Sequence, residues 1–258
     1  MESPRARWRV NSRPKFSVLE MGAYMVAEDD ARETMLQNVK YQRLAPVPLY
    51  RHLYSAIPRF LASPTRDFGI LDKCRADVEG DRDTAATPRA RDNFTYELRA
   101  LEAFQRSFNA LSLQGWTLER APPAAPLKVG GVSVSVQPTV HIRVRRGRYA
   151  DLVGALLVDV AKGIEPKRET GKVKATKSMS YSAMLIHQYV VGIFPTEDPK
   201  PSTDHCIVFH SYRQEAVHCP TNYRLAFKDM EAACRNICRG WDGIEKPASF
   251  DPTDAVYR

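Results

Sequence analysis

The sequence lacks any hydrophobic run close to the roughly 18 residues that cross a lipid bilayer. Its basic start, residues 1–10, contains no apolar stretch of the kind that a secretory leader needs. We therefore expect a cytoplasmic protein with no membrane partner. The 258 residues, 43% of them hydrophobic, are enough for one large core, or for one domain with a smaller helical appendage.

The sequence also lacks the short motifs of several large enzyme classes. It has no G-x-x-x-x-G-K-[ST] loop and no dinucleotide fingerprint, which excludes the common nucleotide-binding cradles. It has no G-x-S-x-G elbow and no H-E-x-x-H pair, which excludes the hydrolases and metalloproteases that depend on them. Gly130 and Gly131 are read as a turn rather than a phosphate-binding loop.

Cysteine is scarce, and none of the five residues forms a C-x-x-C pair. Cys234 and Cys238 are one helical turn apart, and a zinc site could be drawn from them and an upstream group of ligand-type residues. That group consists of His205, Cys206, His210, His218 and Cys219. Without a C-x-x-C pair we favour free, buried cysteines and surface histidines over zinc or a disulfide framework.

Acidic residues are outnumbered, which gives a net charge of +8. A basic balance favours a polyanionic partner, most often nucleic acid, although it can also serve solubility alone. The basic residues gather in residues 5–15, 143–148 and 167–177, and the last two clusters flank Asp159 along the chain. Residues taken from these two clusters as candidate nucleic-acid contacts are Arg143, Arg145, Arg146, Arg148, Lys167, Arg168, Lys172 and Lys174.

Residues 40–63 interleave basic and aromatic side chains, and their apolar spacing predicts a short helix after Pro48. Tyr50, Arg51, Tyr54 and Arg59 lie around the other sides of this helix. Such interleaving suits contacts to phosphates and bases. An amphipathic helix that packs on the core with its arginines in solvent explains the pattern equally well.

Composition divides the chain into an N-terminal arm and helical region (1–76), a polar linker (77–91) and an α/β domain (92–258). In the last part, apolar periodicity predicts a helix over 92–113, with Asp92 as its N-cap and Gly115 after its end. Strands follow between 129 and 162, and a lysine-rich loop then runs to Ser178. The remaining predicted elements are a helix over 179–194, strands over 205–212 and 215–219, and a helix over 222–243.

The strands within residues 129–162 carry polar residues in otherwise apolar runs. Residues 131–136 alternate valine with serine, and 140–144 alternate apolar residues with His141 and Arg143. Residues 155–161 are almost wholly apolar except for Asp159, and Lys162 follows directly. A charge at the end of a buried strand costs several kcal/mol unless it is paired or binds a ligand. A salt bridge between Asp159 and Lys162 and an active site are both consistent with this pattern.

The order of helix, three strands, helix and strand over residues 92–217 resembles the PD-(D/E)XK, or restriction-endonuclease-like, nuclease superfamily. Gln137, Pro138 and Thr139 stand where that family has a metal-binding aspartate, often after proline. Asp159 and Lys162 resemble its next carboxylate and lysine, and Gln188 with Tyr189 resembles the glutamine and tyrosine of its exonuclease branches. The resemblance implies an α/β fold with a central mixed sheet flanked by helices.

In that family two carboxylates hold Mg²⁺ beside the scissile phosphate, and the lysine orients a water molecule. The resemblance implies Asp159, Lys162 and Gln188 as catalytic residues and Asp159 as a ligand of a possible Mg²⁺. The chain departs from the pattern, because Thr139 is neutral and Lys162 lies one residue too far from Asp159. Glu97 or Glu102 of the long helix could supply the missing carboxylate, although solvated helix charges are the commoner explanation.

We expect from these departures a degenerate or partner-dependent nuclease-like subunit that binds nucleic acid. The resemblance places such a subunit in a bacterial defence or mobile-element complex, where a protein partner is plausible. An active metal-dependent nuclease remains an alternative. A protein–protein adaptor that does not bind nucleic acid is the third.

Overall fold

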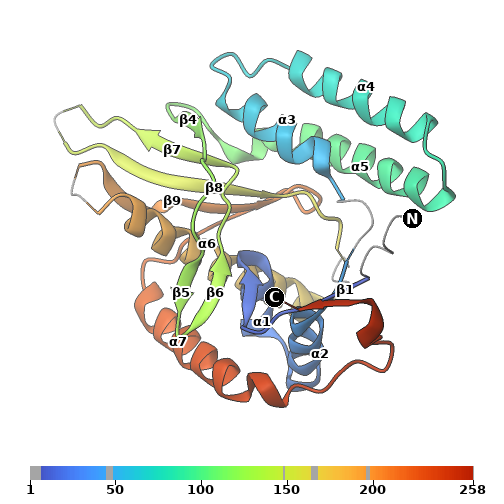
Figure 1. The fold of residues 1–258 in the computed structure, drawn as a ribbon. Coiled ribbons are helices and arrows are strands. Elements are labelled where there is room, and N and C mark those ends of the chain that lie inside the picture. The colour runs from blue at the N-terminus through green and yellow to red at the C-terminus, as the bar shows by residue number, and fades with distance from the viewer. Residues whose placement is uncertain (1–6, 45–48, 148, 164–167, 196–197, 258) are drawn as a thin grey trace.

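A five-stranded mixed sheet, in the order β10-β9-β8-β7-β4, forms the centre of this computed structural model (Figure 1). The structure describes residues 7–44, 49–147, 149–163, 168–195 and 198–257. The strands are β4 (Thr117–Arg120), β7 (Val140–Val144), β8 (Leu152–Asp159), β9 (Lys200–His210) and β10 (Glu215–His218). β8 and β9 run parallel, and the other neighbouring pairs are antiparallel. The expected α/β fold with a mixed central sheet is therefore confirmed.

Helices cover both faces of this sheet (Figure 1). One face packs against α3 (Arg51–Ala62), α4 (Gly69–Asp83) and α5 (Pro88–Ser107), and the other against α1 (Val18–Val26) and α6 (Glu169–Ile193). Strand side chains alternate between the faces, so Leu156 and Val158 of β8 join the first core and Ala155 joins the second. The result is a three-layer arrangement with a core on each side of the sheet.

Two small sheets lie outside the central one. The first pairs β2 (Lys15–Ser17) with the hairpin of β5 (Leu127–Val129) and β6 (Val132–Ser135), and α7 (Tyr223–Gly240) packs against the hairpin. The second joins β11 (Ala255–Tyr257), β1 (Trp8–Val10) and β3 (Tyr41–Arg43). β3 follows directly after the helix α2 (Asp29–Lys40) in the chain. Short 3₁₀ turns complete the described elements: Phe108–Leu111, Trp241–Gly243 and Pro252–Asp254.

The strand predicted over 131–136 exists as β6 but does not belong to the central sheet, which corrects the expected strand order. The first central strand is β4, which the sequence did not reveal. β4 is short and exposed except for Leu118, so it has almost no apolar alternation. The prolines at 122, 123 and 126 separate it from the hairpin. Along the chain, α5, β4, β7, β8, α6 and β9 still follow the expected order of helix, three strands, helix and strand.

Two helices begin earlier than their apolar periodicity predicted. α6 begins at Glu169, so the expected lysine-rich loop is mostly helical. Its first turns carry exposed lysines and therefore lack an apolar stripe, although lysine and alanine favour helix. α5 begins at Pro88, where Thr87 rather than Asp92 is the N-cap and accepts a hydrogen bond from the Ala90 N–H at 3.2 Å.

The polar segment 77–91, expected to be a linker, is largely helical. It covers the end of α4 and the start of α5, which only residues 84–87 separate. Leu71, Cys74 and Val78 of α4 are buried at helical spacing against the same core as α5. Residues before 77 also contribute to both main cores, and β1 lies within a sheet rather than in a loose arm. Among the described helices, none is long and apolar enough to span a membrane.

A candidate cleft at the carboxyl end of strand β8

The central sheet opens on one side of β8 because β7 begins late. The first residue of β7, Val140, pairs with Leu156, so Leu157–Asp159 continue beyond β7 while still pairing with β9. Thr139, the residue before β7, forms the last hydrogen bonds to β8 on the β7 side. Its N–H donates to the Leu156 carbonyl at 2.8 Å, and its hydroxyl oxygen accepts from the Val158 N–H at 2.9 Å.

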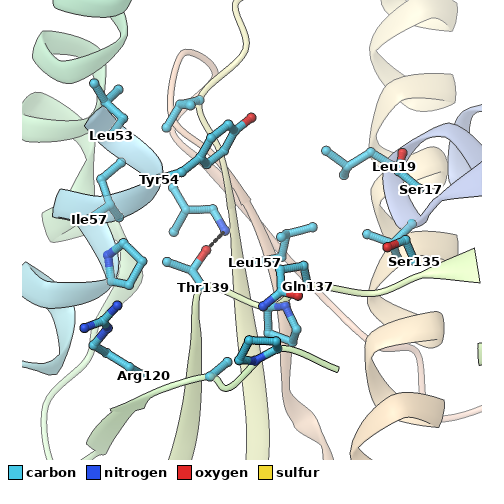
Figure 2. Close-up of a pocket in the computed structure, with 17 residues that line it drawn as sticks. Ser17, Leu19, Leu53, Tyr54, Ile57, Arg120, Ser135, Gln137, Thr139 and Leu157 are labelled. Atoms are coloured by element: carbon cyan, nitrogen blue, oxygen red, sulfur yellow. Dashed lines mark hydrogen bonds between the residues drawn. The ribbon is translucent and has the colours of Figure 1, made fainter. Parts of the chain in front are cut away.

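A cleft of about 520 Å³ lies beside this open part of β8 (Figure 2). α3 forms one wall through Leu53, Tyr54 and Ile57, and the start of α1 forms the opposite wall through Ser17 and Leu19. The floor consists of the end of β8 and the segment that leads into β7. The other lining residues are Val18, Pro58, Arg120, Ala121, Pro123, Ser135, Gln137, Pro138, Thr139, Leu157, Val158 and Val160.

The cleft is mostly apolar and carries one kind of charge. Arg120 is the charged residue of the lining, which contains no carboxylate among the described residues. Arg120 is exposed and forms no ion pair within the described part of the chain. The amide of Gln137 donates to the Pro122 carbonyl at 3.5 Å, which leaves its oxygen as an acceptor. Tyr54 is 62% exposed although it lines the cleft.

Asp159 lies next to the cleft, on the α6 side of the sheet. Its Oδ1 accepts from the Ala161 N–H at 2.9 Å, and on β9 it is paired with His210. Burial lowers the pKa of His210, and the negative charge of Asp159 opposes this shift. Beyond His210, the Nε of Arg213 lies 3.4 Å from Glu215 Oε2. The Asp159 carboxylate is therefore half-buried within a cluster of polar side chains at the carboxyl ends of the parallel strands β8 and β9.

Lys162 lies near this group without binding Asp159. Its side chain is exposed, and among the described residues it forms no ion pair with Asp159. Its backbone approaches the Tyr50 hydroxyl instead. Burial raises the pKa of Tyr50, and Asp159 adds to this rise, whereas the hydrogen bond from the Lys162 backbone lowers it. The pKa of Tyr54 is also raised, first by burial and then by the negative charge of Asp159.

Gln188 is the predicted site residue that the structure does not bring to Asp159. The next residue, Tyr189, forms a 3.1 Å hydrogen bond with His141 Nε2, and His141 pairs with Ala155 in the middle of β8. Met179 contacts Arg213 and so marks the part of α6 that lies beside the carboxyl end of β8, where Asp159 is. Gln188 lies nine residues, or about 13.5 Å, further along the helix axis at 1.5 Å per residue. Its predicted catalytic role has no support in this geometry.

The two glutamates considered as substitutes have other partners. Glu97 is 2% exposed and accepts from the backbone N–H groups of His52 at 2.7 Å and Leu53 at 3.2 Å. It therefore caps α3, where a carboxylate is favoured by the helix dipole. Glu102 lies on the surface with Arg75 3.4 Å away. Neither residue is placed as a second carboxylate beside Asp159.

These side chains do not fit the Mg²⁺ site that the resemblance implies. Mg²⁺ is usually held by one or two carboxylates with water and phosphate oxygens. Here the hydroxyl of Thr139 is engaged with Val158, and of the two positions that the resemblance pairs, Asp159 alone carries a carboxylate. Nowhere in the described ranges do three His, Cys, Asp or Glu side chains gather to hold a metal ion. This finding also covers Cys234 and Cys238, which both lie on α7.

The two basic clusters lie at opposite ends of β8 and do not bracket Asp159. Arg145 and Arg146 are exposed just after β7, whose last residue pairs with Leu152 at the start of β8. The second cluster belongs to the first turns of α6, where Lys172 lies 3.5 Å from Glu169 and Lys174 contacts Glu28. Arg143 lies 3.9 Å from Glu119, and Arg168 is exposed. Arg148 and Lys167 lie outside the described residues.

The cleft itself leaves no contiguous pattern in the sequence. Its walls come from segments near residues 17, 54, 120, 137 and 158, which only the tertiary fold brings together. The interleaved tyrosines and arginines of α3 were the one signal of it. We compared the sequence with protein-family models and with curated proteins, and neither comparison gave a match.

Proposed function

We propose that the chain binds nucleic acid through a nuclease-like core that does not cleave phosphodiester bonds. The observation that carries the proposal is the place of Thr139 and Asp159 in the sheet. Thr139 precedes β7 and bonds Val158, the residue before Asp159, so both lie at the same end of neighbouring strands. This is where the resemblance to the PD-(D/E)XK proteins predicts a pair of carboxylates.

The connectivity of the central sheet supports the same proposal. α5, β4, β7, β8, α6 and β9 follow one another as helix, three antiparallel strands, helix and a strand parallel to the third. In α/β sheets, ligands bind at the carboxyl ends of parallel strands. In this chain those ends carry Asp159, His210 and the neighbouring cleft.

Nucleic-acid binding is supported by the charge of +8 and by the positions of the basic residues. Lys172, Lys177, Arg145 and Arg146 are exposed on the surface. Exposed lysine and arginine side chains attract phosphates and release bound counterions, which supplies affinity without base specificity. The chain would then act as a degenerate or partner-dependent subunit of a defence or mobile-element complex.

Lack of cleavage follows from the chemistry of the two positions. A threonine hydroxyl is a neutral and weak Mg²⁺ ligand, and that of Thr139 already accepts a backbone hydrogen bond. A lone carboxylate at Asp159 does not provide the charge that two carboxylates provide beside a phosphate. The core would keep the shape of a nuclease and use it for binding.

One experiment tests both parts of this proposal. Labelled single- and double-stranded DNA and RNA are incubated with the protein at about 50 and 200 mM salt, with Mg²⁺, Mn²⁺ or a chelator. We expect binding that weakens steeply with salt and no cleavage under any condition. Metal-dependent cleavage that is lost in Asp159→Ala would establish an active nuclease instead. Absence of binding at the lower salt concentration would favour a protein–protein adaptor.

A further inference from the structure

We propose that the cleft beside β8 binds one unpaired nucleotide of a nucleic-acid strand. The base would lie against Tyr54 and the apolar wall of α3, and its phosphate would contact Arg120. This inference rests on the proposed nucleic-acid binding and goes beyond it, because it names a specific site and a preference for unpaired strands.

The size and lining of the cleft suit a nucleotide. Small-molecule sites occupy about 300–1,000 Å³ and are mainly apolar, with a few polar groups that fix orientation. The cleft measures about 520 Å³, and its accessible apolar surface comes from Tyr54 and Pro58 on one side, Leu19 on the other and Leu157 between them. Figure 2 shows these walls facing each other across the end of β8.

Tyr54 provides a surface on which a base can stack. Its ring extends from α3 over the upper part of the cleft and is 62% exposed (Figure 2). Tyr50 meets it edge to face, with ring centroids 6.5 Å apart, and holds its orientation. An aromatic ring that is exposed and supported in this way suits the stacking by which proteins bind single-stranded nucleic acids.

The polar groups of the cleft match an anionic ligand with a hydrogen-bonding edge. Arg120 is the charged residue of the described lining, and the carboxylate of Asp159 lies next to the cleft but outside that lining. The Gln137 oxygen can accept from a base N–H. The Thr139 hydroxyl uses its oxygen as an acceptor for Val158, so its hydrogen remains available as a donor. An apolar peptide would leave these groups without partners.

A binding comparison tests the inference. The probes are labelled oligonucleotides of about 12 thymidines or uridines, the matching duplexes, and TMP. We expect Tyr54→Ala to weaken binding of the single strands at least about fivefold and to leave duplex binding unchanged. Tyr54→Phe keeps the stacking ring and should bind like the wild type. Tyr257→Ala, which removes another exposed tyrosine from β11, is the matched control.

A second variant covers the case in which Tyr54→Ala fails to fold. Arg120→Glu changes an exposed side chain and should also weaken single-strand binding, because it places a negative charge beside the phosphate. If Tyr54→Ala and Arg120→Glu both bind single strands as tightly as the wild type does, the cleft is not the binding site. TMP that binds as tightly as the oligonucleotide would overturn a strand as the occupant. If the wild type binds neither single strands nor duplexes, the proposed function itself fails.

Discussion

The hydroxyl oxygen of Thr139 accepts a hydrogen bond from the Val158 backbone N–H at 2.9 Å. This bond takes the place of a backbone hydrogen bond between β7 and β8, because β7 begins only at Val140. It links β8 to the residue before β7 at the edge of the cleft. The same threonine stands where the nuclease resemblance predicts a carboxylate. The Thr139 side chain therefore has a structural role at this position.

Replacing Thr139 tests this role. Thr139→Val keeps the shape but leaves the Val158 N–H, on a buried residue, without an acceptor, and we expect a loss of about 1–3 kcal/mol in the free energy of unfolding. Thr139→Ser keeps the hydroxyl and should lose less than half of that. Urea denaturation measures both. Equal stability of the valine variant and the wild type would show that the bond contributes nothing.

The separation of the two basic clusters leads to a prediction about salt dependence. Charge reversal at Lys172 and Lys177 should weaken binding to single strands and duplexes alike and flatten the plot of log affinity against log salt. Each lost phosphate contact lowers the slope by about 0.7–0.9. Reversal at Arg145 and Arg146 tests the opposite end of β8 in the same way.

Lys73→Glu is the matched control for these charge reversals, because Lys73 is exposed on α4, away from both clusters. It should change the salt slope less than either pair. If all three changes reduce binding equally for each unit of charge, net charge alone attracts the nucleic acid. Filter binding at several salt concentrations distinguishes these results.

The buried histidines predict a loss of stability in mild acid. Burial lowers the pKa values of His141 and His187 below the value of about 6.5 of an unfolded chain. The unfolded state therefore binds protons first as the pH falls, so stability is complete above about pH 6.5 and declines below it. Urea midpoints measured between pH 8 and about pH 5 should show this decline.

His187→Phe isolates one contribution to that decline. His187 is buried, its Nδ1 has no hydrogen-bond partner in the described part of the chain, and its ring contacts Tyr223 with centroids 4.8 Å apart. Phenylalanine removes the unsatisfied polar atom and the titration, so the variant should be at least as stable at pH 8 and should lose less stability in acid. An unchanged acid dependence would contradict this role of His187.

Gly154 is a position where the parallel pairing of β8 and β9 requires glycine. It lies at the register shift between Val153 and Ala155, and a Cβ there would lie 2.0 Å from the His205 carbonyl oxygen. Gly154→Ala should therefore destabilise the protein by several kcal/mol or prevent folding. Gly192→Ala, on α6 with open space around it, should instead stabilise by about 0.5–1 kcal/mol. Thermal denaturation of the two variants measures both effects.

Part of the fold follows from local sequence patterns. β7 matches its predicted range because alternating apolar residues impose a strand, and β10 and α7 match their predicted ranges closely. β9 was predicted over 205–212 but begins at Lys200 and ends at His210, because its first residues are polar and lack apolar alternation. The first turns of α6 and the strand β4 have little apolar patterning, because they bury few side chains. Local patterns therefore missed them.

The sequence alone determined the α/β class and the excess of basic residues. The tertiary structure decided which residues meet. It separated Gln188 from Asp159, moved the basic clusters to opposite ends of β8 and assigned Glu97 to the start of α3. It also brought Tyr54, Arg120 and Thr139 together around one cleft. The physical reason is that side-chain spacing reports burial along one element, whereas a binding site depends on the register and packing between elements.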